Sequence, residues 1–160
     1  MRYRSQLTFI ILLLNFSYIN GQTLCDGSLP DSTKNIFVIT DTMPEPNLLK
    51  SELEPILNSS INLTKYNLVE GTNIYLGFIV NCKGEDFDYK ILRPVNDAFE
   101  RNLISVTKSN LTFKNGSQIG RPVDVSLTYH IIVENGMLNI LDDDEIKKRN
   151  HKKRKKRRGE

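Results

Sequence analysis

Apolar and polar positions alternate with two different periods along the middle of the chain. In stretches 71–93 and 123–134 the apolar residues fall at every second position, which is the period of a half-buried β-strand. In stretches 48–57 and 97–108 they recur every three or four residues, which is the period of an amphipathic helix. The pattern therefore predicts, in chain order, a helix, two strands, a second helix and a last strand.

The two strands of residues 71–93 are expected to form a β-hairpin. The sequence NCKGED separates them, and its glycine, Gly84, suits the positive φ of a tight turn. Pro94 ends the second strand. The residues expected on the apolar face are Ile74, Leu76, Phe78, Val80, Phe87, Tyr89 and Ile91.

Each predicted helix has a polar residue placed to cap its N-terminus. Asn47 precedes the first helix, Leu48–Leu57, and Asn96 or Asp97 begins the second, which extends to about Lys108. The apolar faces consist of Leu49, Leu53, Ile56 and Leu57 in the first helix, and of Phe99, Leu103, Ile104 and Val106 or Thr107 in the second.

The last strand, Val123–Glu134, is the longest regular element that the pattern predicts. Turn residues at Asn115–Gly116 and Gly120–Pro122 precede it. A short apolar run, Asn35–Thr40, is a further candidate strand. The order of elements indicates an α+β domain, with a three-stranded antiparallel sheet and two helices packed on one of its faces.

The N-terminus has the features of a secretory signal peptide. Arg2 and Arg4 precede the apolar run Leu7–Leu14, which is shorter than the about 20 residues that span a bilayer. Cleavage would follow Gly21, and retention as an uncleaved anchor is the alternative. The expected parts are a signal peptide (1–21), an N-terminal extension (22–42), the α+β domain (43–141) and a tail (142–160).

Charge is distributed unevenly along the chain. Residues 22–141 hold 10 Lys or Arg and 14 Asp or Glu, a net charge of −4, whereas the whole chain has a net charge of +3. In the tail, an acidic patch at 142–145 precedes ten basic residues among the twelve of 147–158. The basic residues are Lys147, Lys148, Arg149, Lys152, Lys153, Arg154, Lys155, Lys156, Arg157 and Arg158.

Such a tail is expected to be disordered, since it has too little apolar surface to pack. It would bind polyanions or an anionic membrane surface through charge alone. A tail that only keeps the protein in solution is the alternative. No aromatic residue is interleaved with the basic ones, so specific nucleic-acid binding is not indicated.

The chain has two cysteines, Cys25 and Cys82. An even number of cysteines in an exported protein favours a disulfide, and two free thiols are the alternative. No histidine or cysteine stands near enough in sequence to Cys82 to suggest a metal site. We expect neither a metal nor a cofactor.

No residue pattern points to catalysis. His130 falls on the polar face of the last strand, where a surface histidine is the simpler interpretation. Glu85, Asp86 and Asp88 follow the hairpin turn but lack the ligand series of a calcium loop. We therefore do not expect an enzyme.

Residues 43–133 resemble the C-terminal domain of TonB-like energy transducers. No single motif is specific, but the features occur in the order of that family. They are MPEP at 43–46, Glu70–Gly71 before the hairpin, Lys83–Gly84 in its turn, Leu92–Arg93 at its end, and Phe113, Gly116, Gly120, Pro122 and Val123 before the last strand.

In that family the last strand lies at or near a sheet edge and accepts a peptide of an outer-membrane receptor by strand addition. The resemblance implies an exported, periplasmic binding module linked to TonB-dependent transmembrane transport, whose partner is a protein or peptide. The residues implied in peptide binding are Asp124, Val125, Ser126, Leu127, Thr128, Tyr129 and His130. Pairing inside the sheet, or with a second copy in a homodimer, is the alternative.

The sequence departs from a transducer, because it shows neither an inner-membrane helix nor a long Pro-rich spacer. We therefore expect a binding module rather than a motor-coupled protein. Four N-x-S/T sequons, at Asn58, Asn62, Asn110 and Asn115, support a rival interpretation. In that interpretation the chain is a secreted glycoprotein that binds an anionic glycan or lipid through its basic tail.

Overall fold

The structure is a computed structural model that describes Cys25 and residues 36–158; the expected signal peptide lies outside the described residues. None of the described helices is long and apolar enough to span a membrane. The helices are α2 (Lys50–Ser60), the 3-10 helix η2 (Leu63–Tyr66), α3 (Asp97–Asn110) and α4 (Asp143–Arg158). The strands are β1 (Glu45–Pro46), β2 (Asn73–Val80), β3 (Asp86–Ile91), β4 (Phe113–Lys114), β5 (Gly116–Gln118), β6 (Arg121–Val123), β7 (Val125–Glu134) and β8 (Met137–Leu141).

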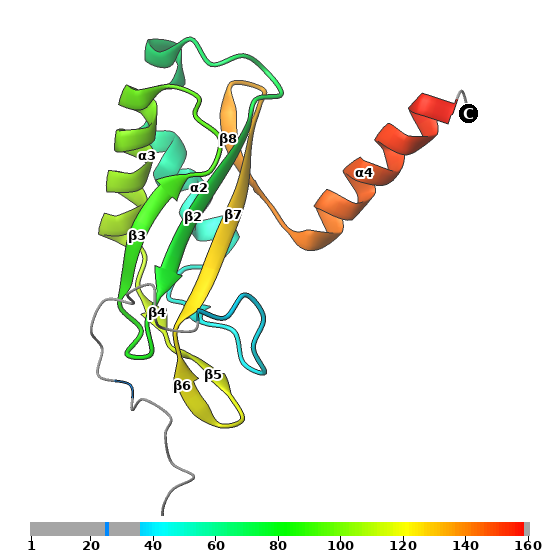
Figure 1. The fold of residues 1–160 in the computed structure, drawn as a ribbon. Helices are drawn as coiled ribbons and strands as arrows, with labels where there is room; N and C mark the ends of the chain where they lie inside the picture. Colours follow the sequence, from blue (N-terminus) through cyan, green and yellow to red (C-terminus); the bar gives the residue numbers. More distant parts are fainter. Residues whose placement is uncertain (1–24, 26–35, 159–160) are drawn as a thin grey trace, which may run out of the picture.

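The main sheet is antiparallel with the strand order β3-β2-β7-β8, and α2 and α3 cover one of its faces (Figure 1). The α+β class is confirmed, but the expected count of three strands is wrong. The strand that the pattern missed is β8. It follows β7 after a two-residue turn, Asn135–Gly136, in which both residues have positive φ. Asn-Gly favours this hairpin turn, so the sequence did contain a signal for β8.

The predicted hairpin is confirmed as β2 and β3, apart from the side on which Phe87 lies. Phe87 pairs with Ile79, whereas Gly77 pairs with Lys90, so β3 has one extra residue between them. That residue is Asp88, which has a φ of 51° and forms a β-bulge. Because the bulge shifts the alternation by one, Phe87 lies on the face away from the helices.

The core lies between the helices and the covered face of the sheet. Phe78 is at its centre, and its ring contacts those of Tyr89, Phe113 and Tyr129 at centroid distances of 4.9, 5.4 and 5.3 Å. The buried apolar residues of the core are Leu53, Leu57, Ile61, Ile74, Leu76, Phe78, Val80, Phe99, Leu103, Leu111, Ile131, Val133, Leu138 and Ile140. The predicted helix faces contribute through Leu53, Leu57, Phe99 and Leu103.

The two helix starts differ in how well the sequence predicted them. Asn96 caps α3 as expected, because its side chain accepts from the backbone N–H groups of Ala98 and Phe99. Asn47 does not cap α2, which begins at Lys50. The Asn47 side chain instead donates to the Asn110 carbonyl and accepts from the Thr112 N–H, so it joins the segment before α2 to the end of α3.

Two short pairs, β1–β4 and β5–β6, lie beside the main sheet. The expected strand Asn35–Thr40 is reduced to one bridge, which Phe37 forms with Val125 in parallel orientation. Asn35 lies outside the described residues. The chain at Thr42 then pairs with Ser117 in β5.

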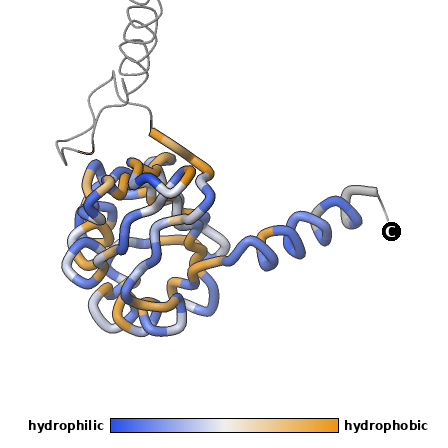
Figure 2. Tube along the Cα trace, turned by 90° about the horizontal axis from the view of Figure 1, so that it is seen from below, coloured by the Kyte–Doolittle hydropathy of each residue, from blue (hydrophilic) through white to orange (hydrophobic). Residues whose placement is uncertain are grey.

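The tail differs from the disordered segment that we expected, since residues 143–158 form α4 (Figure 1). A capping box begins it: the Asp142 carboxylate accepts the Glu145 N–H, and the Glu145 carboxylate accepts the Asp142 N–H. The capping box is a local sequence signal for a helix, whereas the composition of the tail favours disorder. Figure 2 shows α4 as a largely hydrophilic helix that extends away from the rest of the fold.

Candidate interaction edge on strand β7

We expected the last strand at or near a sheet edge, and β7 lies between β2 and the edge strand β8, so it is near the edge and not at it. Its pairing with β2 extends from Val125 to Ile132. Backbone groups of a strand point to opposite sides at successive residues. The odd-numbered residues of β7 are bonded towards β2, as the bonds of Val133 with Gly71 and Thr72 show. The backbone N–H and C=O groups of the even-numbered residues therefore point away from β2, towards the side on which β8 lies.

On that other side β7 is covered only in part. Strand β8 pairs with His130–Glu134. At the opposite end, Phe37 donates its N–H to the Asp124 carbonyl (2.9 Å) and accepts the Ser126 N–H (2.8 Å). Thr128 lies between these two contacts. Among the described residues no strand stands opposite its outward N–H and C=O groups, so the expected edge is reduced to the surroundings of Thr128.

The outer edge of β8 is closed to strand addition by side chains of α2. Asn58 donates to the Leu138 carbonyl (2.9 Å) and accepts the Leu138 N–H (2.7 Å). Glu54 accepts the Ile140 N–H (2.6 Å). An edge whose backbone groups are already bonded does not recruit another strand. Strand β3, at the far side of the sheet, has no strand outside it in the described part, but the bulge at Asp88 interrupts its edge.

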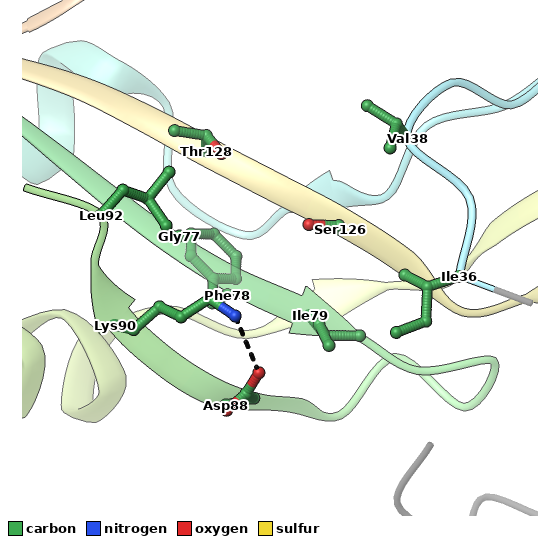
Figure 3. A pocket seen from close by; sticks show the side chains of 10 residues that line it. All are labelled: Ile36, Val38, Gly77, Phe78, Ile79, Asp88, Lys90, Leu92, Ser126 and Thr128. Atoms are coloured by element: carbon green, nitrogen blue, oxygen red, sulfur yellow. Dashed lines mark hydrogen bonds and ion pairs between the residues drawn. The ribbon is translucent and has the colours of Figure 1, made fainter. Parts of the chain in front are cut away.

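A pocket of about 350 Å³ opens beside Thr128 on the sheet face that the helices leave uncovered (Figure 3). Its floor is low because Gly77 has no side chain there. An added Cβ at Gly77 would lie 3.2 Å from Leu92 Cδ2. Its lining combines apolar and polar residues, namely Ile36, Val38, Phe78, Ile79, Leu92, Asp88, Lys90, Ser126 and Thr128. The sequence did not reveal this pocket, because its lining comes from four separate segments.

The residues expected to bind a peptide fall into two groups. Val125, Leu127 and Tyr129 face the core, where burial raises the pKa of Tyr129 to about 12. Their side chains therefore point away from the uncovered face of the sheet. Ser126, Thr128 and His130 lie on the uncovered face, and the Asp124 carboxylate accepts the N–H of Cys82 (2.9 Å).

His130 belongs to a row of stacked side chains on the uncovered face of the sheet. Its ring stacks on Tyr75 at 4.5 Å, and its Nε2 lies 2.9 Å from Asn73 Oδ1. The Arg93 guanidinium lies over the Tyr75 ring, 5.3 Å from the ring centre. Among the described residues, no three His, Cys, Asp or Glu side chains are grouped so as to hold a metal ion.

The disulfide between Cys25 and Cys82 is confirmed, with a Cα–Cα distance of 5.8 Å. It joins the N-terminal segment to the turn between β2 and β3. The turn itself is ordered by Asn81, whose buried side chain accepts the N–H groups of Lys83 and Glu85. Closing a loop of this length removes on the order of 4 kcal/mol of chain entropy from the unfolded state.

The basic residues expected to bind polyanions lie on α4, and one of them, Arg149, is bonded to the domain. The two terminal guanidinium nitrogens of Arg149 donate to the Glu134 carboxylate, which lowers the pKa of Glu134 and raises that of Arg149. Lys50 lies 2.5 Å from the Glu145 carboxylate and lowers its pKa. The exposed cations of α4 include Lys147, Lys148, Lys152, Arg154 and Lys155. Nothing is described of the side chains of Lys153, Lys156, Arg157 and Arg158.

The sequons differ in how available their asparagine nitrogens are. Asn58 Nδ2 bonds two carbonyls, Asn110 Nδ2 bonds the Val106 carbonyl, and Asn115 Nδ2 bonds the Gly116 carbonyl. Asn62 is exposed, and its Oδ1 accepts from Thr64. Three of the four sequons that supported the glycoprotein interpretation are thus engaged in the fold.

No family model, curated protein or solved structure matches the chain. The resemblance to TonB C-terminal domains therefore stays a prediction from the sequence.

Proposed function

We propose that the chain is an exported binding module of the TonB C-terminal type, which accepts an extended partner peptide by strand addition at β7. In that family the partner belongs to an outer-membrane receptor, so the proposed role is linked to TonB-dependent transport. The ordered motifs of residues 43–133 support the family assignment. No catalytic step is part of the proposal.

The observation that carries this proposal is the open stretch of β7 at Thr128. Its N–H and C=O groups point away from β2, and no described strand stands opposite them. Unpaired backbone groups of this kind are what an added strand bonds. The pocket beside Thr128 gives room for a partner side chain on the same face. The other long edge of this part of the sheet, β8, is occupied by Asn58 and Glu54.

The test is selection of peptides on the full chain from a phage-displayed library of random octapeptides. We expect enriched peptides with alternating apolar residues, and we expect Thr128→Pro to reduce their binding by about tenfold or more. Proline removes the outward N–H, and each backbone bond contributes about 0.5–1.5 kcal/mol. Thr128→Val, which keeps the N–H, is the matched control. Equal binding by the two variants, or no enrichment at all, would contradict the proposal.

A second candidate function, polyanion binding by α4, is favoured by a separate observation. No acidic residue follows Glu145 in this helix, which has exposed lysines and arginines and extends away from the rest of the fold (Figure 2). A helix of this charge binds an anionic glycan or an anionic lipid surface by releasing counterions.

Polyanion binding predicts a strong dependence on salt. We expect the affinity for heparin oligosaccharides or for phosphatidylserine vesicles to fall steeply between about 50 and 200 mM salt. Replacing Lys152 and Lys155 by Gln should weaken binding, whereas replacing Lys83 and Lys108, which lie on the folded domain, should not. Comparison of the two probes separates a glycan from a lipid partner. A salt-independent affinity would contradict this candidate.

A further inference from the structure

The segment Ile36–Ile39, called the arm below, already occupies part of the edge where we propose that a partner binds. Phe37 forms one rung of a parallel ladder with β7, through its bonds to Asp124 and Ser126. The arm is thus a strand-like segment bound at the beginning of β7, immediately before Thr128.

The side chains of the arm show how a bound strand would meet the pocket. Ile36 and Val38, on either side of Phe37, both line it (Figure 3). They fill it incompletely, since Ile36 is 38% exposed and Val38 is 71% exposed. A strand at this edge therefore presents alternate side chains to the pocket, and there is apolar surface left for a better-fitting occupant.

The arm leaves β7 after its single rung. If it continued parallel to β7, residue 39 would bond the Ser126 carbonyl and the Thr128 N–H. Ile39 is instead 83% exposed, and Asp41 accepts the N–H of Ile119 (2.7 Å) in the turn between β5 and β6. The second rung, at Thr128, is left without an occupant from the described chain.

Hydrogen bonds on one side and a disulfide on the other hold the arm near β7. Towards the C-terminus, Thr42 and Ser117 exchange backbone bonds of 2.8 and 3.1 Å. Towards the N-terminus, the chain reaches Cys25, which is joined to Cys82 in the β2–β3 turn. Because an intramolecular segment competes at a high effective concentration, a free peptide that made only the same rung would not displace it.

We infer that the arm is an internal competitor for the partner, and that it marks the direction and chemistry of partner binding. The partner peptide runs parallel to β7, replaces the arm at Asp124 and Ser126, and adds the second rung at Thr128. Apolar side chains at alternate positions of the partner lie over the pocket. This inference rests on the proposed function, because it concerns occupancy of the same edge.

The first test needs no partner. In Phe37→Pro the N–H that bonds Asp124 is absent, so we expect the arm to leave and the Ser126 amide to exchange with solvent about tenfold faster. Phe37→Ala keeps the backbone bond and is the matched control. The Ile131 amide, which is bonded towards β2, reports that the sheet stays folded. Unchanged exchange at Ser126 in a folded Phe37→Pro chain overturns the inference.

The second test uses a peptide of residues 36–42, which contains the arm, with a nitroxide label at one end. It should bind Phe37→Pro about tenfold more tightly than Phe37→Ala, because the internal competitor has been released. With the label at its N-terminus it should broaden the Asp124 amide, and with the label at its C-terminus the His130 amide. The reverse pattern would show an antiparallel strand and overturn the inference.

The two proposals fail in different ways. If library-selected peptides depend on Thr128 but bind Phe37→Pro and Phe37→Ala equally, the arm is no competitor and strand addition still stands. If Phe37→Pro frees the Ser126 amide yet no peptide binds in a Thr128-dependent manner, the proposed function is wrong, and the inference about the partner fails with it.

Discussion

Gly116 lies where three separated segments of the chain meet. A Cβ atom added to it would lie 2.9 Å from Pro44 Cδ, from the Thr42 carbonyl oxygen and from Val125 Cγ2. One of these atoms belongs to the backbone and another to a fully buried side chain, so neither can turn aside. The glycine that begins β5 is therefore required by close packing and not by an unusual φ.

Gly116→Ala is expected to destabilise the fold by about 1–3 kcal/mol, because the added methyl group forces these segments apart. Denaturant unfolding measures the change. Gly77→Ala is the matched control, since its Cβ would meet only the movable side chain of Leu92, at 3.2 Å. We expect less than about 1 kcal/mol for that variant. Equal losses for the two variants would contradict this account of Gly116.

At the scale of elements, α2 protects the sheet as well as covering it. Asn58 and Glu54 lie one turn apart on this helix and bond three backbone groups of β8. Side chains thus replace the strand that would otherwise be needed outside β8. The sequence pattern treats both residues as polar helix positions, and only the packing of α2 against β8 gives them this role.

Asn58→Ala is expected to lower the free energy of unfolding by about 1–3 kcal/mol, because the Leu138 N–H and C=O groups lose their partner. It should also promote self-association, which analytical ultracentrifugation at increasing protein concentration would detect. Ser59→Ala, at an exposed position of the same helix, is the control. If Asn58→Ala were as stable and as monomeric as the control, the edge would not depend on this side chain.

At the scale of the whole molecule, two ion pairs join α4 to the domain. They are Arg149 with Glu134 and Lys50 with Glu145, and each lowers the pKa of its carboxylate from the usual 4.5. A carboxylate whose pKa is lowered by docking stabilises the docked state at pH values above the pKa that it has in the unfolded chain. That contribution is lost as the pH falls through the lowered pKa.

We therefore expect α4 to stay docked from neutral pH down to about 4.5 and to gain motion below it. Relaxation of the backbone amides of residues 146–149 would measure this change between pH 7 and pH 3. Glu134→Gln should produce much of the same motion at neutral pH. Asp144→Asn should not, because the ion pair that Asp144 forms with Lys147 lies within α4 itself. A pH-independent relaxation profile would argue against docking by these ion pairs.

Local patterns in the sequence were sufficient for much of the fold. The alternation of residues 71–93 determined the hairpin, because a strand period of two needs no knowledge of the partner. The Asn96 cap and the spacing of Phe99 and Leu103 determined α3 in the same way. The Asn-Gly turn before β8 and the Asp142–Glu145 capping box are also local signals. The charge of the tail nevertheless favoured a disordered segment over a helix.

Only the tertiary structure decided which edge is open. Whether β7 is an edge depends on β8, on the arm at Phe37 and on how α2 packs against Leu138, and these contacts join residues far apart in sequence. The pocket beside Thr128 likewise forms only where segments far apart in the sequence come together. The sequence by itself determined which segments become strands and helices, since that follows from local periodicity. Neighbour relations between strands determine where backbone groups stay unpaired, and these relations exist only in the folded chain.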